Sequence, residues 1–173
     1  QTVYIEERIE EILPNLVKEK KIRKVLVVCD APCKELVVAK QVAELAVEQI
    51  WFSDFTPNPN YESVVEGVKK YKENDCDAVL AIGGGSSMDV AKCIKLYATM
   101  NPDENYLRQT PKENAIPLMA IPTTAGTGSE ATRFAVIYYD GEKQSVVHDS
   151  IIPKYVFLNS QVLVGLPDYQ KKA

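Results

Sequence analysis

Three consecutive glycines at 83–85 separate an apolar run at 78–82 from a segment with helical periodicity at 86–96. The pattern predicts a strand, a tight glycine turn and a helix, with Ser86 or Ser87 as the N-cap. Because glycine has no Cβ, the backbone N–H groups of such a turn can approach a ligand closely. The positive end of the helix dipole faces the same point and favours an anion such as a phosphate. A plain strand-to-helix turn is the alternative, and it rarely needs three glycines.

The stretch matches neither of the two commonest nucleotide-binding signatures. A P-loop requires a glycine, four residues and then Gly-Lys-Ser/Thr, an order that does not occur in this chain. The dinucleotide fingerprint G-x-G-x-x-G requires a glycine at position 88, where the sequence has Met88. The predicted phosphate-binding turn therefore belongs to a less common kind.

The rest of the chain repeats the order of strand and helix. Apolar runs predict strands at 23–29, 50–55, 77–82 and 116–121, and amphipathic segments predict helices at 3–20, 36–48 and 61–74. Pro14 is expected to interrupt the first helix, whose inward side chains would include Ile5 and Ile9. The succession predicts one α/β domain over residues 1–173, built on a doubly wound parallel sheet.

A β-hairpin is expected near the C-terminal end of the sequence. Asp140-Gly141 separates the segments 133–139 and 142–148, and this dipeptide suits a two-residue primed turn. A last apolar run follows at 155–158.

Polar loops follow several of the predicted strands. Asp30 comes directly after the first strand, Asn58 lies between two prolines after the second, and the glycine turn follows the third. A further loop at 122–130, with hydroxyl side chains and two glycines, follows the strand at 116–121. In doubly wound sheets, ligands bind beyond the carboxyl ends of the strands, so these loops predict one shared site. A flexible surface loop is the alternative for 122–130.

Charge and hydropathy exclude several classes of partner. The net charge is −4, and the two signs are interspersed, so neither a nucleic-acid-binding face nor a polybasic membrane patch is expected. No apolar segment approaches the roughly 20 residues of a membrane span. The chain starts at Gln1 without a signal-type apolar region, which predicts a cytoplasmic protein with a processed or excised start.

Cysteine and histidine positions restrict the metal and redox chemistry. Cys29, Cys33, Cys76 and Cys93 match neither a zinc-binding pair nor a convincing disulfide scaffold, so we expect reduced, buried thiols. His148 is the only histidine. A histidine-rich metal centre cannot be built from this chain alone, and a Ser-His-Asp triad would have to use that one residue.

Taken together, GGGSSMDVAK and PTTAGTGSEAT resemble the motifs of the iron-containing (group III) alcohol dehydrogenase family, in the dehydroquinate synthase-like superfamily. The resemblance extends from about Val25 to Ala173. It implies a Rossmann-like N-terminal domain that binds NAD(P), and a C-terminal helical domain that holds a divalent metal, iron or zinc. The family interconverts alcohols with aldehydes or ketones by hydride transfer to or from nicotinamide.

The resemblance assigns cofactor-binding roles to eleven positions, and metal-binding or catalytic roles to none. Asp30 matches the acid that meets the adenosine ribose; it would repel a 2′-phosphate, so NAD is expected rather than NADP. That acid precedes the glycine turn, whereas the ordinary dinucleotide fold places it about 20 residues after the turn. Asp89 matches an acidic position near the nicotinamide. The other implied positions are Asn58, Gly84, Gly85, Ser86, Thr123, Thr124, Thr127, Ser129 and Lys143.

The sequence departs from the family pattern in three places. Ser87 stands where the family often has proline, and Asn159 where it often has aspartate. Beyond Ala173 the family would continue into the helices that carry the metal ligands. We therefore expect the metal domain to be absent from this chain, and the chain alone to be inactive.

Several readings of function remain open. The first is the cofactor-binding part of a metal-dependent alcohol dehydrogenase, with a small alcohol or aldehyde as substrate and a homodimer as one assembly. The second is a stand-alone nucleotide-binding module without catalysis. A dehydroquinate synthase-like enzyme is the third, although the GTGSE segment resembles the alcohol dehydrogenase branch. The segment 132–144 also has some similarity to branches that reduce phosphonoacetaldehyde.

Overall fold

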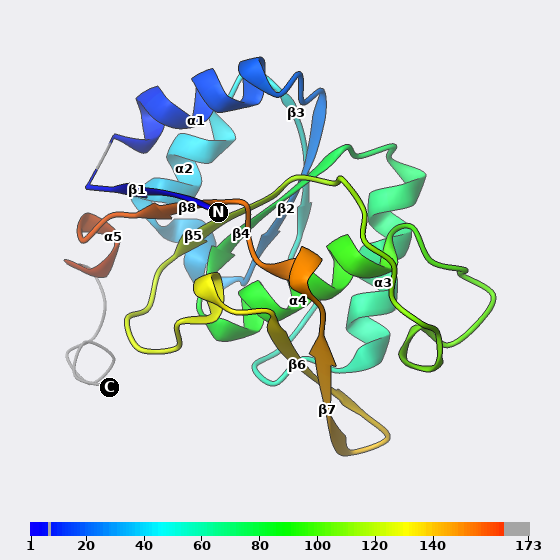
Figure 1. The fold of residues 1–173 in the computed structure, drawn as a ribbon. Helices are drawn as coiled ribbons and strands as arrows, with labels where there is room; N and C mark the ends of the chain where they lie inside the picture. The colour runs from blue at the N-terminus through cyan, green and yellow to red at the C-terminus, as the bar shows by residue number, and fades with distance from the viewer. Residues whose placement is uncertain (7, 165–173) are drawn as a thin grey trace.

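The computed structural model describes residues 1–6 and 8–164. Its centre is a parallel sheet of six strands in the order β1-β8-β5-β4-β2-β3 (Figure 1). The strands are β1 (Thr2–Ile5), β2 (Lys24–Cys29), β3 (Glu48–Phe52), β4 (Ala78–Gly83), β5 (Leu118–Pro122) and β8 (Tyr155–Leu158). The predicted parallel α/β sheet is confirmed.

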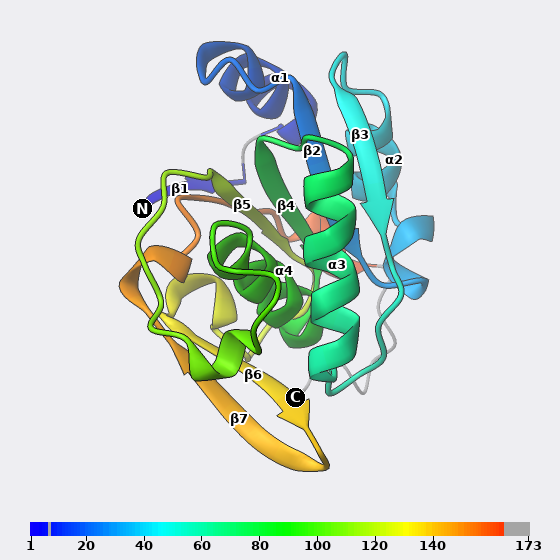
Figure 2. The ribbon, with the colours of Figure 1, turned by 90° about the vertical axis from the view of Figure 1, so that its right-hand side faces the viewer.

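Helices cover both faces of this sheet. Helices α1 (Ile9–Glu19) and α2 (Val37–Ala43) lie on one face, and α3 (Tyr61–Glu73) and α4 (Gly85–Tyr97) on the other (Figure 1, Figure 2). Successive strand residues point to opposite faces, so the apolar side chains divide between two cores. Val27 and Leu80 pack with the first pair of helices, and Val28 and Ala81 with the second. This double coverage explains why the central strands β4 and β5 are apolar and buried along their whole length. A short helix, α5 (Gln161–Val164), follows β8.

The predicted hairpin is present as β6 (Phe134–Tyr139) and β7 (Glu142–Val147), which form a separate antiparallel pair. Asp140 and Gly141 have φ values of 51° and 75°, as a primed two-residue turn requires. Ala135, Ile137 and Val146 are buried in the same core as α3 and α4. The hairpin therefore covers α4 on the side away from the sheet (Figure 1).

The first segment of the chain differs from the predicted helix at 3–20. Residues Thr2–Ile5 form an edge strand that pairs with β8, and Ile5 is 65% exposed rather than directed inward. Glu6, with a φ of 53°, separates this strand from α1. Pro14 does not interrupt α1, because the loss of one hydrogen bond is offset by the burial of Ile9, Leu13 and Leu16.

The second predicted helix is shorter than expected. A 3₁₀ helix at Pro32–Glu35 precedes α2, and α2 ends at Ala43 rather than at position 48. Strand β3 begins at Glu48, two residues before the predicted start, and pairs along β2. Pairing with β2 thus outweighs the helical preference of the residues before Ile50.

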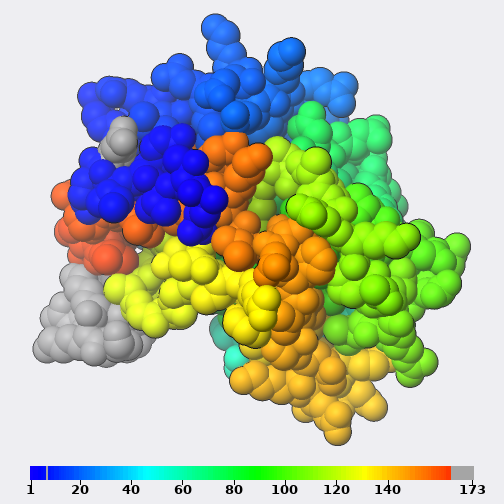
Figure 3. All heavy atoms as spheres, viewed as in Figure 1, coloured from blue at the N-terminus to red at the C-terminus, as the bar shows by residue number. Residues whose placement is uncertain are grey.

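The segment before α1 and the start of β8 lie side by side on one surface (Figure 3). The side chain of Gln1 donates hydrogen bonds to the carbonyl oxygens of Pro153 (2.9 Å) and Glu130 (2.7 Å). The two ends of the described chain are therefore joined through the sheet and through this side chain.

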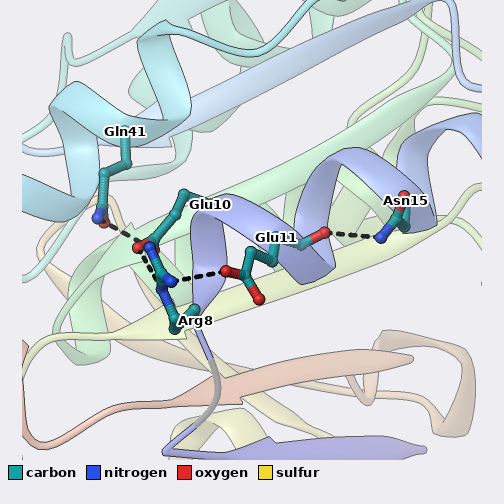
Figure 4. A network of polar contacts seen from close by, with 5 residues as sticks. All are labelled: Arg8, Glu10, Glu11, Asn15 and Gln41. Carbon is teal, nitrogen blue, oxygen red and sulfur yellow. Dashed lines mark hydrogen bonds and ion pairs between the residues drawn. The ribbon is translucent and has the colours of Figure 1, made fainter.

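An exposed polar network joins α1 to α2 (Figure 4). Arg8 forms ion pairs with Glu10 at 3.0 Å and with Glu11 at 2.7 Å, and Gln41 on α2 donates to Glu10 at 3.2 Å. Asn15 donates to the backbone oxygen of Glu11 at 2.9 Å. Because these groups are exposed, we expect the network to contribute little to stability.

All four cysteines are free thiols, as predicted. Cys29, Cys76 and Cys93 are buried and Cys33 is half-buried. Burial raises the pKa of Cys29 and of Cys33 to about 12, and that of Cys76 to about 11. None of the helices within residues 1–6 and 8–164 is long and apolar enough to cross a membrane.

Candidate functional site

The carboxyl ends of three neighbouring strands, β2, β4 and β5, bring the predicted loops together. β4 lies between β2 and β5, so Asp30, the glycine turn and Thr123 follow directly from adjacent strands. Thr123 donates its backbone N–H to the carbonyl oxygen of Gly83 at 3.0 Å. The structure therefore places these loops at one edge of the sheet, as the sequence predicts.

The glycine turn contains a position that only glycine fits. Gly83 has a φ of 145°, and a Cβ placed there would lie 2.3 Å from the Oγ of Ser87. The N-cap of α4 is Gly84, not Ser86 or Ser87 as predicted, since Gly84 is still extended and the helix begins at Gly85. Both serines therefore lie in the first turn of the helix, whose free N–H groups face the end of the sheet.

The loop at 122–130 lies against this turn. A Cβ on Gly84 would be 3.2 Å from the Oγ1 of Thr124, and one on Gly85 would be 3.4 Å from Thr127. The Thr124 hydroxyl is buried and has no hydrogen-bond partner in the described part of the chain. An unpaired hydroxyl beside a helix N-terminus is a feature that a bound anion would satisfy. Thr124 thus packs on the glycine turn, whereas residues 125–127 are exposed.

Asp30 lies beside the glycine turn with one carboxylate oxygen already bonded. Its Oδ1 accepts from the backbone N–H of Cys33 at 2.9 Å, and its Oδ2 lies 3.6 Å from the Cβ position of Gly83. The Sγ of Cys33 lies 3.4 Å from the Oγ1 of Thr123. Cys33 is a site residue that sequence reasoning missed, although its place in the turn after Asp30 was a usable signal.

The Pro-Asn-Pro loop also reaches the start of α4. Asn58 is exposed with a φ of 57°, and its backbone N–H donates to the Oγ of Ser86 at 3.4 Å. Tyr138 donates its backbone N–H to the carbonyl oxygen of Pro59 at 2.9 Å, which joins this loop to the hairpin. Lys143 is exposed on β7 opposite Tyr138, so β6 lies between it and the Pro-Asn-Pro loop.

Asp89 on α4 forms hydrogen bonds with both the loop at 122–130 and the hairpin. Its Oδ1 accepts from the hydroxyl of Ser129 at 3.0 Å, and its Oδ2 accepts from the backbone N–H of Val136 at 3.1 Å. Burial raises the pKa of Asp89, and these two hydrogen bonds oppose that shift. Two of the predicted cofactor residues, Asp89 and Ser129, thus contact each other.

Lys92 completes the same network and was not predicted. Its Nζ donates to the oxygens of Phe134 (2.7 Å), Thr132 (3.1 Å) and Ser129 (3.2 Å), and the side chain is fully buried. These contacts hold the segment after the loop on α4. A lysine at helical spacing ordinarily indicates a solvent-exposed face, so the sequence held no signal for this role.

The chemistry available at this edge is that of anion and polyol binding. It combines backbone N–H groups at a helix N-terminus, threonine hydroxyls and one carboxylate. Within residues 1–6 and 8–164, no group of three or more His, Cys, Asp or Glu side chains is arranged to hold a metal ion. His148 lies in a different place, where its Nδ1 accepts from the backbone N–H of Ser150 at 3.1 Å.

The fold and this edge define a doubly wound α/β protein with a glycine turn at the N-terminus of α4. The sequence model for iron-containing alcohol dehydrogenases matches residues 1–160. The chain belongs to this family, as its motifs predicted.

Several characterised proteins are similar to this chain. Alcohol dehydrogenase 4 of Saccharomyces cerevisiae is 35% identical over 162 residues, which cover 88% of this chain and 42% of that protein. The NAD-dependent methanol dehydrogenase of Bacillus methanolicus is 37% identical over 134 residues, covering 75% of this chain and 35% of that protein. The chain thus spans less than half the length of these relatives.

Solved structures share the fold. A 1,3-propanediol oxidoreductase superposes with a TM-score of 0.90 at 23% identity, over 99% of this chain and 47% of that one. The NADH-dependent butanol dehydrogenase A of Thermotoga maritima gives a TM-score of 0.87 at 26% identity, over 99% of this chain and 45% of that one.

Proposed function

We propose that this chain forms the NAD-binding part of a metal-dependent alcohol dehydrogenase that acts on a small alcohol or aldehyde. The observation that carries the proposal is the unpaired Thr124 hydroxyl above Gly84, at the N-terminus of α4. A similar methanol dehydrogenase is NAD-dependent. A sulfoacetaldehyde reductase from Bifidobacterium kashiwanohense, with a TM-score of 0.85 at 24% identity, was solved in complex with NAD+.

Each part of the edge has a role in this proposal. The N–H groups at Gly84, Gly85 and Ser86 would bind the pyrophosphate, and the adjacent threonine hydroxyls would bind the same anion. Asp30 would accept from the adenosine ribose hydroxyls. Asn58, in the Pro-Asn-Pro loop, and Lys143, on the hairpin, would lie along the remainder of the cofactor. Bound nicotinamide would supply hydride transfer.

The metal of such an enzyme has no ligand set among the described residues, so no metal-dependent step is assigned to them. We therefore expect the 173-residue chain alone to show no dehydrogenase turnover. Metal-dependent oxidation of a primary alcohol by the isolated chain would contradict this expectation.

A thermal-shift titration with NAD and with NADP tests the cofactor assignment. At about 100 times its dissociation constant, a ligand stabilises the folded state by roughly 2.7 kcal/mol. The absence of any shift with NAD would overturn the proposal.

Asp30→Asn tests the preference for NAD. The substitution keeps an acceptor for the N–H of Cys33 and removes the charge that opposes a 2′-phosphate. We expect the dissociation constant for NADP, divided by that for NAD, to fall by about tenfold, which corresponds to about 1.4 kcal/mol. Asp54→Asn, at an exposed position, is the matched control. An unchanged ratio would show that Asp30 does not set the preference.

A further inference from the structure

A cavity of about 710 Å³ lies toward the end of α4 that is remote from the glycine turn. Its walls include Lys95 on α4, Glu113 and Asn114 before β5, and Asp149 and Lys154 before β8. Lys95 is ten residues after Gly85, and a helix rises about 1.5 Å per residue, which places it about 15 Å along the axis. Lys95 is therefore remote from the glycine turn.

Lys95 is the buried amine of this cavity. Its side chain is 3% exposed, and its Nζ donates to the backbone oxygen of Asn114 at 3.0 Å. Asn114 donates back to the carbonyl oxygen of Lys95 at 2.9 Å. A lysine ammonium group has three N–H donors, and the described residues provide Lys95 with this one acceptor.

The charges around Lys95 do not compensate for its burial. Glu113 raises the pKa of Lys95, but burial has the larger effect and lowers that pKa to about 8. Asp149 forms an ion pair with Arg133 at 3.1 Å, and Lys154 adds a second cation to the cavity. A large share of Lys95 is therefore neutral amine, a nucleophile, in mildly alkaline solution.

We propose that Lys95 is a covalent modification site, where a small aldehyde that enters this cavity forms an imine. The Nζ lone pair attacks the carbonyl carbon, and a proton moves to the carbonyl oxygen to give a carbinolamine. The carbinolamine hydroxyl and the remaining amine proton then leave together as water, and the C=N bond forms. No oxidant or reductant is consumed. Glu113, which lines the cavity and whose charge acts on Lys95, is the carboxyl group that can carry the proton.

The choice of an aldehyde rests on the proposed function, because an alcohol dehydrogenase forms or consumes aldehydes. The reactivity of the amine does not depend on that function. A site of this kind would record exposure of the protein to aldehyde.

Reductive trapping tests the proposal on the 173-residue chain. The chain is incubated with acetaldehyde and cyanoborohydride near pH 8, and peptide mass spectrometry measures the alkylation rate at each lysine. An ordinary lysine has a pKa of about 10.4, so Lys95 would hold roughly a hundredfold more neutral amine. Allowing for restricted access, we expect alkylation about tenfold faster at Lys95 than at the exposed Lys112.

Two further measurements separate reactivity from nonspecific labelling. The alkylation rate at Lys95 should level off above about pH 9, whereas the alkylation rates at exposed lysines should continue to rise. Lys92, whose Nζ has three acceptors, should stay unlabelled. Labelling at Lys95 that is no faster than at Lys112, or that shows no levelling, would overturn the proposal.

The labelling experiment and the thermal-shift titration with NAD test the two proposals separately. Fast labelling of Lys95 without any thermal shift by NAD would overturn the proposed function alone. A clear NAD shift with slow labelling of Lys95 would overturn this inference alone.

Discussion

Lys92 and Lys95 lie one turn apart on α4 and are both buried, but their ammonium groups have different surroundings. Lys92 donates to three oxygens, at 2.7, 3.1 and 3.2 Å, and Asp89 opposes the lowering of its pKa by burial. Lys95 donates to one oxygen at 3.0 Å and lines a cavity. A buried cation with all its donors bonded can hold loops in place, whereas one with few partners costs stability and is available for reaction.

The largest expected effect is that of Lys92→Met. The change leaves the oxygens of Ser129, Thr132 and Phe134 without this donor and removes the positive charge near Asp89. We expect a loss of about 3 kcal/mol in the free energy of unfolding, measured in urea. Lys69→Met on the exposed face of α3 should change it by less than about 0.5 kcal/mol. If Lys92→Met and Lys69→Met changed the free energy of unfolding equally, the buried contacts of Lys92 would not contribute to stability.

Lys95→Met should raise the free energy of unfolding at neutral pH, whereas Lys92→Met lowers it. The size of the Lys95→Met effect should depend on pH. Folded Lys95 loses its proton near pH 8 and unfolded lysine near pH 10.4, so between these values the unfolded state binds more protons. The wild type therefore gains stability from Lys95 as pH rises through this window, and the methionine variant does not.

The variant should be more stable than the wild type by about 1 kcal/mol near pH 7, since a poorly paired buried charge is removed. Its advantage should fall by about 2 kcal/mol by pH 10. Urea denaturation of both proteins across this range measures the difference. A difference that is constant with pH would contradict the assignment of a lowered pKa to Lys95.

Thr132→Val tests one acceptor of Lys92 by itself. The substitution keeps the branched shape and removes the oxygen at 3.1 Å, so two acceptors remain. We expect a loss of about 1 kcal/mol in unfolding free energy. In a Lys92→Met background the same change should cost less, and full additivity of the two effects would argue against a direct contribution of this contact.

The smallest effect is expected for Arg8→Ala, an exposed cation with two carboxylate partners. The Arg8 side chain is 68% exposed, and its pairs with Glu10 and Glu11 are in contact with solvent. We expect no measurable change in the free energy of unfolding, because solvent and salt screen such exposed pairs. If Arg8→Ala lowered the free energy of unfolding as much as Lys92→Met, burial would not explain why Arg8 and Lys92 contribute differently to stability.

Local signals predicted the parts of the structure that depend on nearby residues. The apolar run before Gly83, the Asp140-Gly141 turn and the polar residues after each strand were placed correctly, because each depends on a few neighbouring positions. The first strand was missed, since Thr2–Ile5 is a strand only through its pairing with Tyr155–Leu158.

The errors at the site have the same origin. The N-cap lies at Gly84 because the strand passes directly into the helix through a backbone conformation specific to Gly83. The partners of Lys92 lie some 40 positions further along the chain, and that of Lys95 lies 19 positions away. The pattern of residues within α4 therefore could not predict the contacts of Lys92 or of Lys95.

The pairing of β1 with β8 also bears on the order in which the molecule forms. Thr2 pairs with Tyr155, so a loop of about 150 residues must close, at an entropic cost on the order of 4 kcal/mol. Contacts this distant in sequence form slowly, and this one needs β8 to have been synthesised. β1 is therefore synthesised about 150 residues before its partner and can pair only once β8 has been made.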